Sequence, residues 1–350
     1  MKLAFDATDW RGFQVLAWTA TFLTLAGVAT EALGLKYVQE VEWPTDLFAT
    51  AALRRPAGID VAIVGSSRSH YGFAPTAIDA CLSARLNRPT QTVSSNRLAA
   101  STYATDIVAR DLFSGERAPR VLVIEVAPES LNANHFELDY NVASSADVRD
   151  VPECVAAAVS GPPALAACAR PLVRGVENLA FFLHRPLTEH DHVTWMALFA
   201  GGGQYCFGTP ACEARNAEYD QRHAGRWQTR IERVLPKVRA ERFVDYQVGS
   251  GLPSAHFVAM LDRARADGVT PLVVNLPVSA TYQAEVPVEA YAAYLAWVAP
   301  TTAAHGGRFL NLNMPDWQER PEYLDPDHLN GKGALRLSQR LCDEVADSLH

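Results

Sequence analysis

Short apolar runs alternate along this chain with stretches in which apolar residues recur every three or four positions. The runs have the length and the β-branched content of strands that are buried on both faces, and they cover residues 60–65, 90–94, 120–126, 271–276 and 308–312. The run RVLVIEV at 120–126 is the strongest of them, because Pro119 and Pro128 bound it. Strands that alternate with helices predict an α/β fold with three layers (α/β/α) around a mostly parallel five-stranded sheet.

Helical spacing predicts the elements that connect these strands, at 75–86, 99–113, 255–266, 288–298 and 333–349. The alternation stops between 131 and 253, where helical patterns at 155–183 and 226–243 flank a Gly-rich loop. A connection of this length predicts an inserted helical subdomain within an α/β domain that spans 58–349. Such insertions often cover the carboxyl ends of the strands, where ligands bind, so we expect this one to determine substrate specificity.

The N-terminal region has its own pattern. Residues 12–30 form a run of 19 positions without a formal charge. At about 1.5 Å per residue, such a run just spans a hydrocarbon core of roughly 30 Å. We therefore interpret 1–35 as an uncleaved membrane anchor and 36–57 as a connector, with a cleaved signal peptide or a buried helix as the alternatives. Lys2 and Arg11 precede the run, which predicts a cytoplasmic N-terminus and an α/β domain on the extracytoplasmic (periplasmic) side of a cell envelope.

Composition and charge narrow the classes of partner. The chain is 350 residues long with 49% hydrophobic side chains, which is a globular composition. It carries 31 Lys and Arg against 39 Asp and Glu, a net charge of −8. A net negative chain gains no general attraction to phosphate backbones, so we expect no nucleic-acid partner.

The cysteines predict disulfides and no metal site. Cys206 and Cys212 lie close together in GGGQYCFGTPAC, which suits a short disulfide-closed loop in an oxidising compartment. Cys154 and Cys168 flank an Ala-rich stretch and are a second candidate pair, although buried thiols explain all four equally well. No CxxC or His spacing of a zinc site occurs in the sequence, so we predict neither a metal nor another cofactor.

Two short segments carry candidate chemistry. GSSRS at 65–69 directly follows the first strand, where a serine reaches the carboxyl edge of a parallel sheet beside the N–H groups of a helix start. DPDHLNGKG at 325–333 precedes the last helix and offers His328 as a base near neutral pH. Asp325 can hold one imidazole nitrogen while the other takes a proton from a serine. Taken singly, GSSRS is equally an ordinary turn whose serine caps a helix, and DPDH alone favours a polar loop whose Asp caps a turn.

Together the two segments resemble the SGNH/GDSL hydrolase superfamily. GSSRSHYGFAP and HLNGKGA are nearest to its membrane-associated members that act in the O-acylation of cell-envelope glycans. The resemblance covers about 55–129 and 255–349, and not the insertion. It implies a flavodoxin-like strand order, with Ser67 as the nucleophile, Asp325 as the orienting acid and His328 as the general base.

Other positions depart from the family pattern. Ser66 stands where many members have Asp, and the usual oxyanion glycine is replaced by the segment 95–100, from which a backbone N–H or the Asn96 side chain would serve. The family's GxND block corresponds to 126–130, where no residue matches. Arg68 is either a ligand for an anionic group or a solvated surface arginine. Ser66, Arg68 and Asn96 are thus the candidate oxyanion or substrate residues.

The function that these features predict is that of a serine-dependent esterase or O-acyltransferase. Its substrate would be an acyl ester of a cell-envelope glycan or of a lipid-linked relative, cleaved through an acyl-enzyme. The alternative is a catalytically weak or inactive protein of the same fold that binds a glycan or a membrane acyltransferase. A cytoplasmic esterase without a membrane anchor is a third possibility.

Overall fold

A computed structural model gives the structure of the protein. It describes residues 14, 17–19, 21–22, 25, 58–96, 100–110, 118–134, 204–317 and 322–349. The chain divides into two compact units, one of Met1–Gln39 with Leu138–Asp191 and one of Glu40–Glu137 with His192–His350. All the strands described below belong to the second unit.

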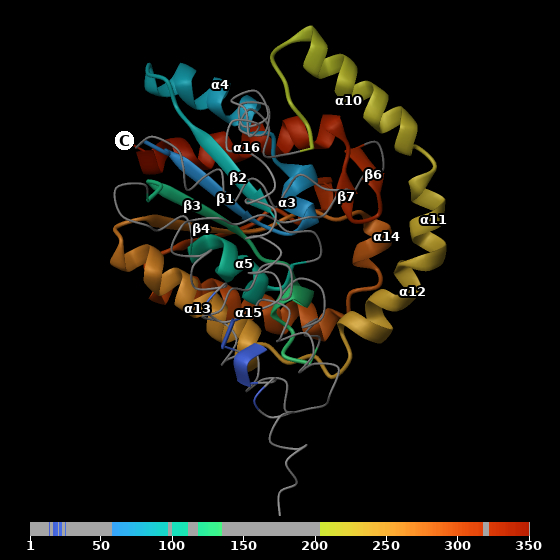
Figure 1. Ribbon diagram of the computed structural model, residues 1–350. Helices are drawn as coiled ribbons and strands as arrows, with labels where there is room; N and C mark the ends of the chain where they lie inside the picture. The colour runs from blue at the N-terminus through green and yellow to red at the C-terminus, as the bar shows by residue number, and fades with distance from the viewer. Residues whose placement is uncertain are drawn as a thin grey trace, which may run out of the picture. The chain divides into compact units, whose positions relative to one another are not determined.

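Five parallel strands form the central sheet (Figure 1). They are β1 (Val61–Gly65), β2 (Thr92–Asn96), β3 (Val121–Glu125), β4 (Thr270–Asn275) and β5 (Arg308–Asn311). Their order is β2-β1-β3-β4-β5, and every neighbouring pair is parallel. The predicted α/β class, the parallel sheet and its order are therefore confirmed.

Helices cover both faces of this sheet, as the apolar strands require. Alternate side chains of a strand point to opposite faces, so Ala62 and Val64 pack on one side of β1 while Val61 and Ile63 pack on the other. The first side is covered by α5 (Thr102–Arg110), α13 (Gly251–Ala266) and α15 (Val288–Ala304). The second is covered by α4 (Pro75–Leu86) and α16 (Gly331–Leu349). This arrangement is the predicted three-layer architecture (Figure 1).

Several short elements complete the described part of the second unit. They are α3 (Ser67–Gly72), η2 (Pro128–Leu131), α14 (Ala280–Gln283), η8 (Pro315–Trp317) and the strands β6 (Tyr323–Asp325) and β7 (His328–Leu329). A disulfide between Cys81 and Cys342 joins α4 to α16 across 261 positions of sequence. The sequence did not predict this pair, because two cysteines that far apart give no local signal.

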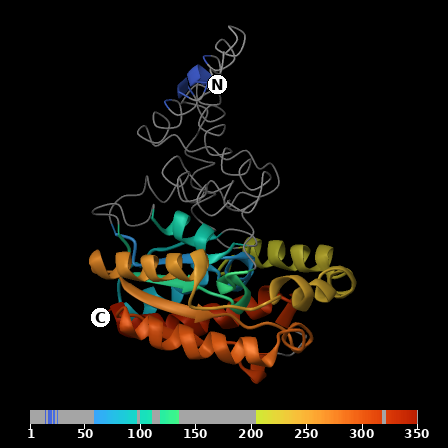
Figure 2. The same cartoon turned by 90° about the horizontal axis from the view of Figure 1, so that it is seen from below.

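The described part of the predicted insertion is helical, as expected. It forms what we call the arm, residues 204–250, with α10 (Pro210–His223), α11 (Arg226–Arg233), α12 (Leu235–Lys237) and the π-helix η7 (Val238–Arg242). These elements lie together at one end of the sheet (Figure 1, Figure 2). The Cys206–Cys212 disulfide is confirmed and closes the loop before α10. The predicted helix at 155–183 and the pair Cys154 and Cys168 lie outside the described residues.

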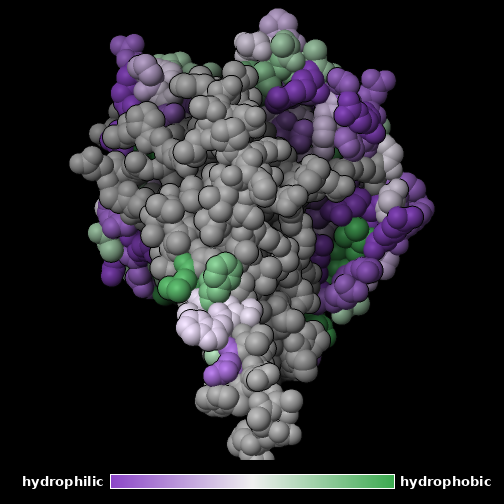
Figure 3. Space-filling view, viewed as in Figure 1, coloured by the Kyte–Doolittle hydropathy of each residue, from purple (hydrophilic) through white to green (hydrophobic). Residues whose placement is uncertain are grey.

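The arm is amphipathic. Its inner side chains Leu235, Val238 and Phe243 are buried against Tyr282 of α14 and Ala290 of α15. Its outer face is mostly hydrophilic, as Figure 3 shows. The exposed residues on that face include Gln228, Glu232, Arg233, Lys237 and Arg239. The arm is therefore held on the α/β domain by its own apolar stripe.

The prediction of a membrane anchor is wrong for the residues that the structure describes. None of the helices among them is both long enough and apolar enough to cross a membrane. The helical residues described between 14 and 25 include Gln14, Thr19 and Thr21, and the Thr21 hydroxyl donates to the Ala17 carbonyl. The absence of charge over 12–30 favoured a span in spite of this polar content. The extracytoplasmic placement that rested on the anchor is withdrawn with it, and the connector 36–57 lies outside the described residues.

Candidate active site

Strand β1 ends at Gly65, and the chain turns there directly into α3. Ser66 caps that helix, because its Oγ accepts a hydrogen bond from the Arg68 N–H at 3.1 Å. A side chain at position 65 has no room, since a Cβ there would lie 2.6 Å from the Cβ of Glu125. The tight turn makes Ser67 the first residue of α3, at the carboxyl edge of the sheet.

His328 reaches Ser67 from the other end of the chain. Strands β6 and β7 form an antiparallel hairpin that pairs Asp325 with His328. The His328 Nε2 lies 2.8 Å from the Ser67 Oγ, and its Nδ1 lies 2.9 Å and 3.0 Å from the two Asp325 carboxylate oxygens. Asp325 is 1% exposed and His328 is 6% exposed. The structure thus brings the three predicted residues into the contacts of a nucleophile, a base and an orienting acid.

The imidazole is held by neighbours on α3 and on the arm. The rings of His328 and Tyr71 pack at 4.8 Å between centroids, and the Tyr71 and Tyr219 hydroxyls share a hydrogen bond of 2.8 Å. Asp220 of α10 accepts a hydrogen bond from the Gly331 N–H at 3.0 Å. Asp220 of the arm therefore bonds to the segment just after His328, and Tyr219 of the arm bonds to the Tyr71 side chain that packs on the imidazole.

A second carboxylate and a guanidinium lie against the same imidazole. The Asp327 Oδ1 lies 3.5 Å from the His328 Nδ1, and Arg230 of α11 donates to that Oδ1 at 2.9 Å. Arg230 also places its Nε 3.5 Å from Asp325 and its Nη2 3.4 Å from the His328 Nδ1. Burial alone would raise the pKa of Asp327, but the charges of His328, Arg230 and Arg242 outweigh burial and hold that pKa well below its ordinary value.

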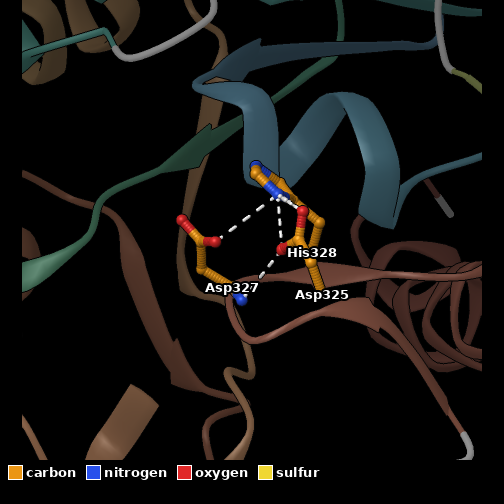
Figure 4. A group of neighbouring side chains, drawn as sticks. All are labelled: Asp325, Asp327 and His328. Atoms are coloured by element: carbon orange, nitrogen blue, oxygen red, sulfur yellow. Dashed lines mark hydrogen bonds and ion pairs between the residues drawn. The ribbon is translucent and has the colours of Figure 1, made fainter. Parts of the chain in front are cut away.

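The same cluster has the composition of a metal site. One ligand atom from each of Asp325, Asp327 and His328 lies within 4.8 Å of the others, and the three side chains converge in Figure 4. The guanidinium of Arg230 already supplies a positive charge to both carboxylates. The His328 Nδ1 is the nitrogen that Asp325 holds. A metal bound here would displace these contacts, so the cluster fits proton transfer better than metal binding.

Ser66 acts through its backbone as well as its side chain. Its N–H donates to Glu125 Oε2 at 2.6 Å, so this N–H is committed within the turn. Glu125 is buried at the end of β3, and burial raises the pKa of its carboxyl group above the ordinary value. Sequence reasoning missed Glu125, although an acidic side chain inside the apolar run RVLVIEV was a signal for it.

Arg68 is not a solvated surface arginine. It is 7% exposed, and its Nη2 donates to Glu129 Oε1 at 2.5 Å while its guanidinium lies 4.8 Å from the centre of the Tyr282 ring. The Tyr282 hydroxyl donates to the same Glu129 oxygen, and Arg242 donates to that hydroxyl. Burial would raise the pKa of Glu129, but the two arginines and this hydrogen bond outweigh burial and lower it. Arg68 therefore belongs to a buried ion-pair network directly behind the nucleophile.

Asn96 is also committed within the protein. It is 1% exposed, its Oδ1 accepts from the Ser69 hydroxyl at 2.8 Å, and its Nδ2 donates to Ser94 at 2.6 Å. These contacts tie the end of β2 to α3, and residues 97–99 lie outside the described residues. The Ser67 N–H donates to none of the residues that the structure describes, whereas the Ser66 and Arg68 N–H groups on either side of it are both engaged. Asn132, just beyond the GxND-like stretch, bonds instead to the backbone of 242–247.

No protein-family model matches this chain, and no curated protein sequence matches it either. The functional interpretation therefore depends on the geometry of the site and on the resemblance of the two short segments.

Proposed function

We propose that this protein is a serine-dependent acyl-ester hydrolase or O-acyltransferase of the SGNH type. The observation that carries the proposal is the chain of contacts from the Ser67 Oγ through both nitrogens of His328 to Asp325. A serine hydroxyl is a weak nucleophile by itself, and a hydrogen-bonded base with an orienting carboxylate is the arrangement that activates it.

The chemistry follows from these contacts. The Ser67 Oγ attacks the ester carbonyl carbon while the His328 Nε2 takes the hydroxyl proton, and Asp325 stabilises the imidazolium that forms. The Ser67 N–H, at the carboxyl edge of the sheet, stabilises the negative charge on the carbonyl oxygen. His328 then returns the proton to the departing alcohol oxygen as the C–O bond breaks, which leaves an acyl-enzyme on Ser67.

The second half of the reaction decides between the two activities. Water or a sugar hydroxyl attacks the acyl-enzyme carbonyl, His328 takes the proton of the attacking oxygen, and the Ser67 Oγ leaves and recovers a proton from His328. The segments GSSRSHYGFAP and HLNGKGA resemble glycan O-acylation proteins, and this resemblance supports an acylated glycan as the substrate.

Covalent labelling tests the nucleophile directly. The full-length wild type is incubated with a fluorophosphonate probe beside Ser67→Ala and beside Ser83→Ala, a control in which a serine of α4 is removed. We expect the wild type and Ser83→Ala to be labelled equally, and Ser67→Ala not to be labelled. A folded wild type that is not labelled would contradict the proposal and favour a glycan-binding protein with an inactive site.

Product analysis then separates hydrolase from transferase. The labelled acyl group of a synthetic ester is followed with and without an oligosaccharide acceptor. Transfer to the acceptor that His328→Ala abolishes would establish the transferase, whereas release to water in both conditions would establish the hydrolase.

A further inference from the structure

Helix α11 carries a positive charge to the base of the candidate triad. The Arg230 guanidinium contacts Asp327 at 2.9 Å, and its Nη2 lies 3.4 Å from the His328 Nδ1. The Arg230 side chain is 29% exposed, whereas those of both Asp327 and His328 are 7% exposed. The guanidinium therefore reaches in from the surface to charges that the protein otherwise buries.

The two added charges oppose each other at the imidazole. Asp327 lies 3.5 Å from the His328 Nδ1 and stabilises the protonated ring, whereas the nearby guanidinium of Arg230 destabilises it. Arg230 and Asp327 also pair with each other, so a carboxylate and a guanidinium lie against the Nδ1 side of the ring as one ion pair. Asp325 is then left as the acceptor of the Nδ1 proton.

The two other cations near His328, Arg68 and Arg242, do not take the place of Arg230 at the ring. Among the described residues, the groups that contact the His328 ring are Asp325 and Asp327 of its own hairpin segment, Ser67 and Tyr71 of α3, and Arg230 of α11. Arg68 and Arg242 lie farther away, and their charges act on Asp327. Arg68 and Arg242 are both engaged with the Glu129–Tyr282 network. Of the three cations named here, Arg230 is the one that contacts the ring itself.

We propose that Arg230 and Asp327 are a charge-balanced pair of positioning residues that sets the pH range over which His328 acts as a base. The proposal rests on the proposed function, in which His328 is the general base. Arg230 belongs to the arm, which the family resemblance does not cover, and Asp220 of the same arm holds the Gly331 N–H just after His328. The arm thereby contributes a positive charge to the site.

A direct titration of His328 tests this inference without requiring turnover. The full-length protein is labelled with ¹³C at the histidine Cε1 positions, His328 is assigned by comparison with His328→Gln, and its chemical shift is followed against pH. We expect Arg230→Gln to move the midpoint of the His328 titration upward by about one pH unit, because a cation is removed. We expect Asp327→Asn to move it downward, and the double variant to lie between the two single variants.

Two controls separate charge from structure. Arg230→Lys retains the charge and is expected to keep the midpoint near that of the wild type. Arg233→Ala removes an exposed arginine from the same helix and is expected to leave the midpoint unchanged. If the acyl-ester activity exists, the acid limb of kcat/KM moves with the same sign in each variant.

The outcomes are distinguishable from a failure of the proposed function. Single variants that shift the midpoint in the same direction, or that leave it unchanged while they stay folded by circular dichroism, would overturn the inference. A wild type without turnover or labelling would overturn the proposed function, and the titration would still decide whether the pair controls His328.

Discussion

Two buried His–Asp pairs in this protein look alike and differ in their surroundings. In the candidate site, the His328 Nδ1 meets Asp325, and Arg230 lies on the carboxylate side. Between α5 and α13, the His256 Nδ1 lies 2.8 Å from Asp106, and Arg263 donates to the same carboxylate at 2.6 Å. Both therefore combine an imidazole, an aspartate that holds its Nδ1 and an arginine beside that aspartate, and the candidate site adds Asp327.

The difference lies in what the imidazole faces and in which elements hold it. His328 sits on a hairpin and presents its Nε2 to Ser67 at the carboxyl edge of the sheet. His256 sits on a helix that packs against α5, and its ring lies against the Tyr103 ring of α5, with the ring centroids 4.1 Å apart and the planes tilted. A His–Asp–Arg group thus joins two helices in one place, whereas in the other its imidazole contacts the Ser67 hydroxyl at the carboxyl edge of the sheet.

The largest effect expected from this comparison is on turnover. Asp325→Asn keeps the size of the side chain but presents an amide to Nδ1, which favours the wrong tautomer and is expected to lower kcat by about 10⁴-fold. Asp106→Asn makes the same change in the helix pair and is expected to leave kcat nearly unchanged while the protein is folded. Steady-state kinetics on a small activated ester measure both. Comparable losses in the two variants would contradict the distinction.

A smaller effect is expected on the free energy of unfolding, and here Asp106→Asn is expected to lose more than Asp325→Asn. Asp106→Asn removes the charge that binds both His256 and Arg263, and breaking such a buried pair is expected to lower the free energy of unfolding by about 3–5 kcal/mol. Asp325→Asn is expected to lower it less, because Asp327 still lies beside both Arg230 and His328. Urea unfolding of the two variants beside the wild type checks the order. A more stable Asp106→Asn than Asp325→Asn would show that the helix pair does not depend on its ion pair.

The smallest effect is a change in the acid dependence of stability. Burial would raise the pKa of Asp106, but hydrogen bonds from His256 and Arg263 and their charges outweigh burial and lower it. Its folded-state pKa therefore lies below the unfolded value of about 3.9, so its contribution is present above that pH and is lost as the pH falls further. Asp327 has a lowered pKa with the same sign and remains in an Asp106→Asn variant.

Unfolding by urea at several pH values between neutral and acidic conditions measures this contribution. The wild type is expected to lose more stability on acidification than Asp106→Asn does. Equal losses in the two proteins would show that Asp106 is not held in its charged form by the helix pair.

Much of the fold was predictable because its signals are local. Residues 121–125 are four apolar residues and one Glu between Pro119 and Pro128, and in an α/β chain such a short apolar run indicates a buried strand. The helix at 75–86 was predicted with its observed bounds, because Pro75 starts it and its apolar spacing is regular. The residues Asp325 and His328 were predictable as a pair because they lie three positions apart in one turn.

The membrane anchor shows where a local count misleads. The lack of charge over 12–30 favoured a span although the run contains four Thr and one Gln, and none of the helices among the described residues is long and apolar enough to cross a membrane. The predicted oxyanion role of the Asn96 side chain is a second example. Its position after β2 was recognised, but its side chain is committed to Ser69 and Ser94.

By itself, the sequence determined most of the strand and helix pattern and the order of the chemistry along the chain, and it offered Cys206–Cys212 as a disulfide without excluding free thiols. The resemblance of two segments implied that Ser67 and His328 act together, but only the tertiary structure brought them to 2.8 Å, joined Cys81 to Cys342 and placed Arg230 of the arm against Asp327. The physical reason is the distance along the chain. Apolar periodicity and turn chemistry act over a few residues, whereas these contacts join segments that only the packing of helices onto the sheet brings together.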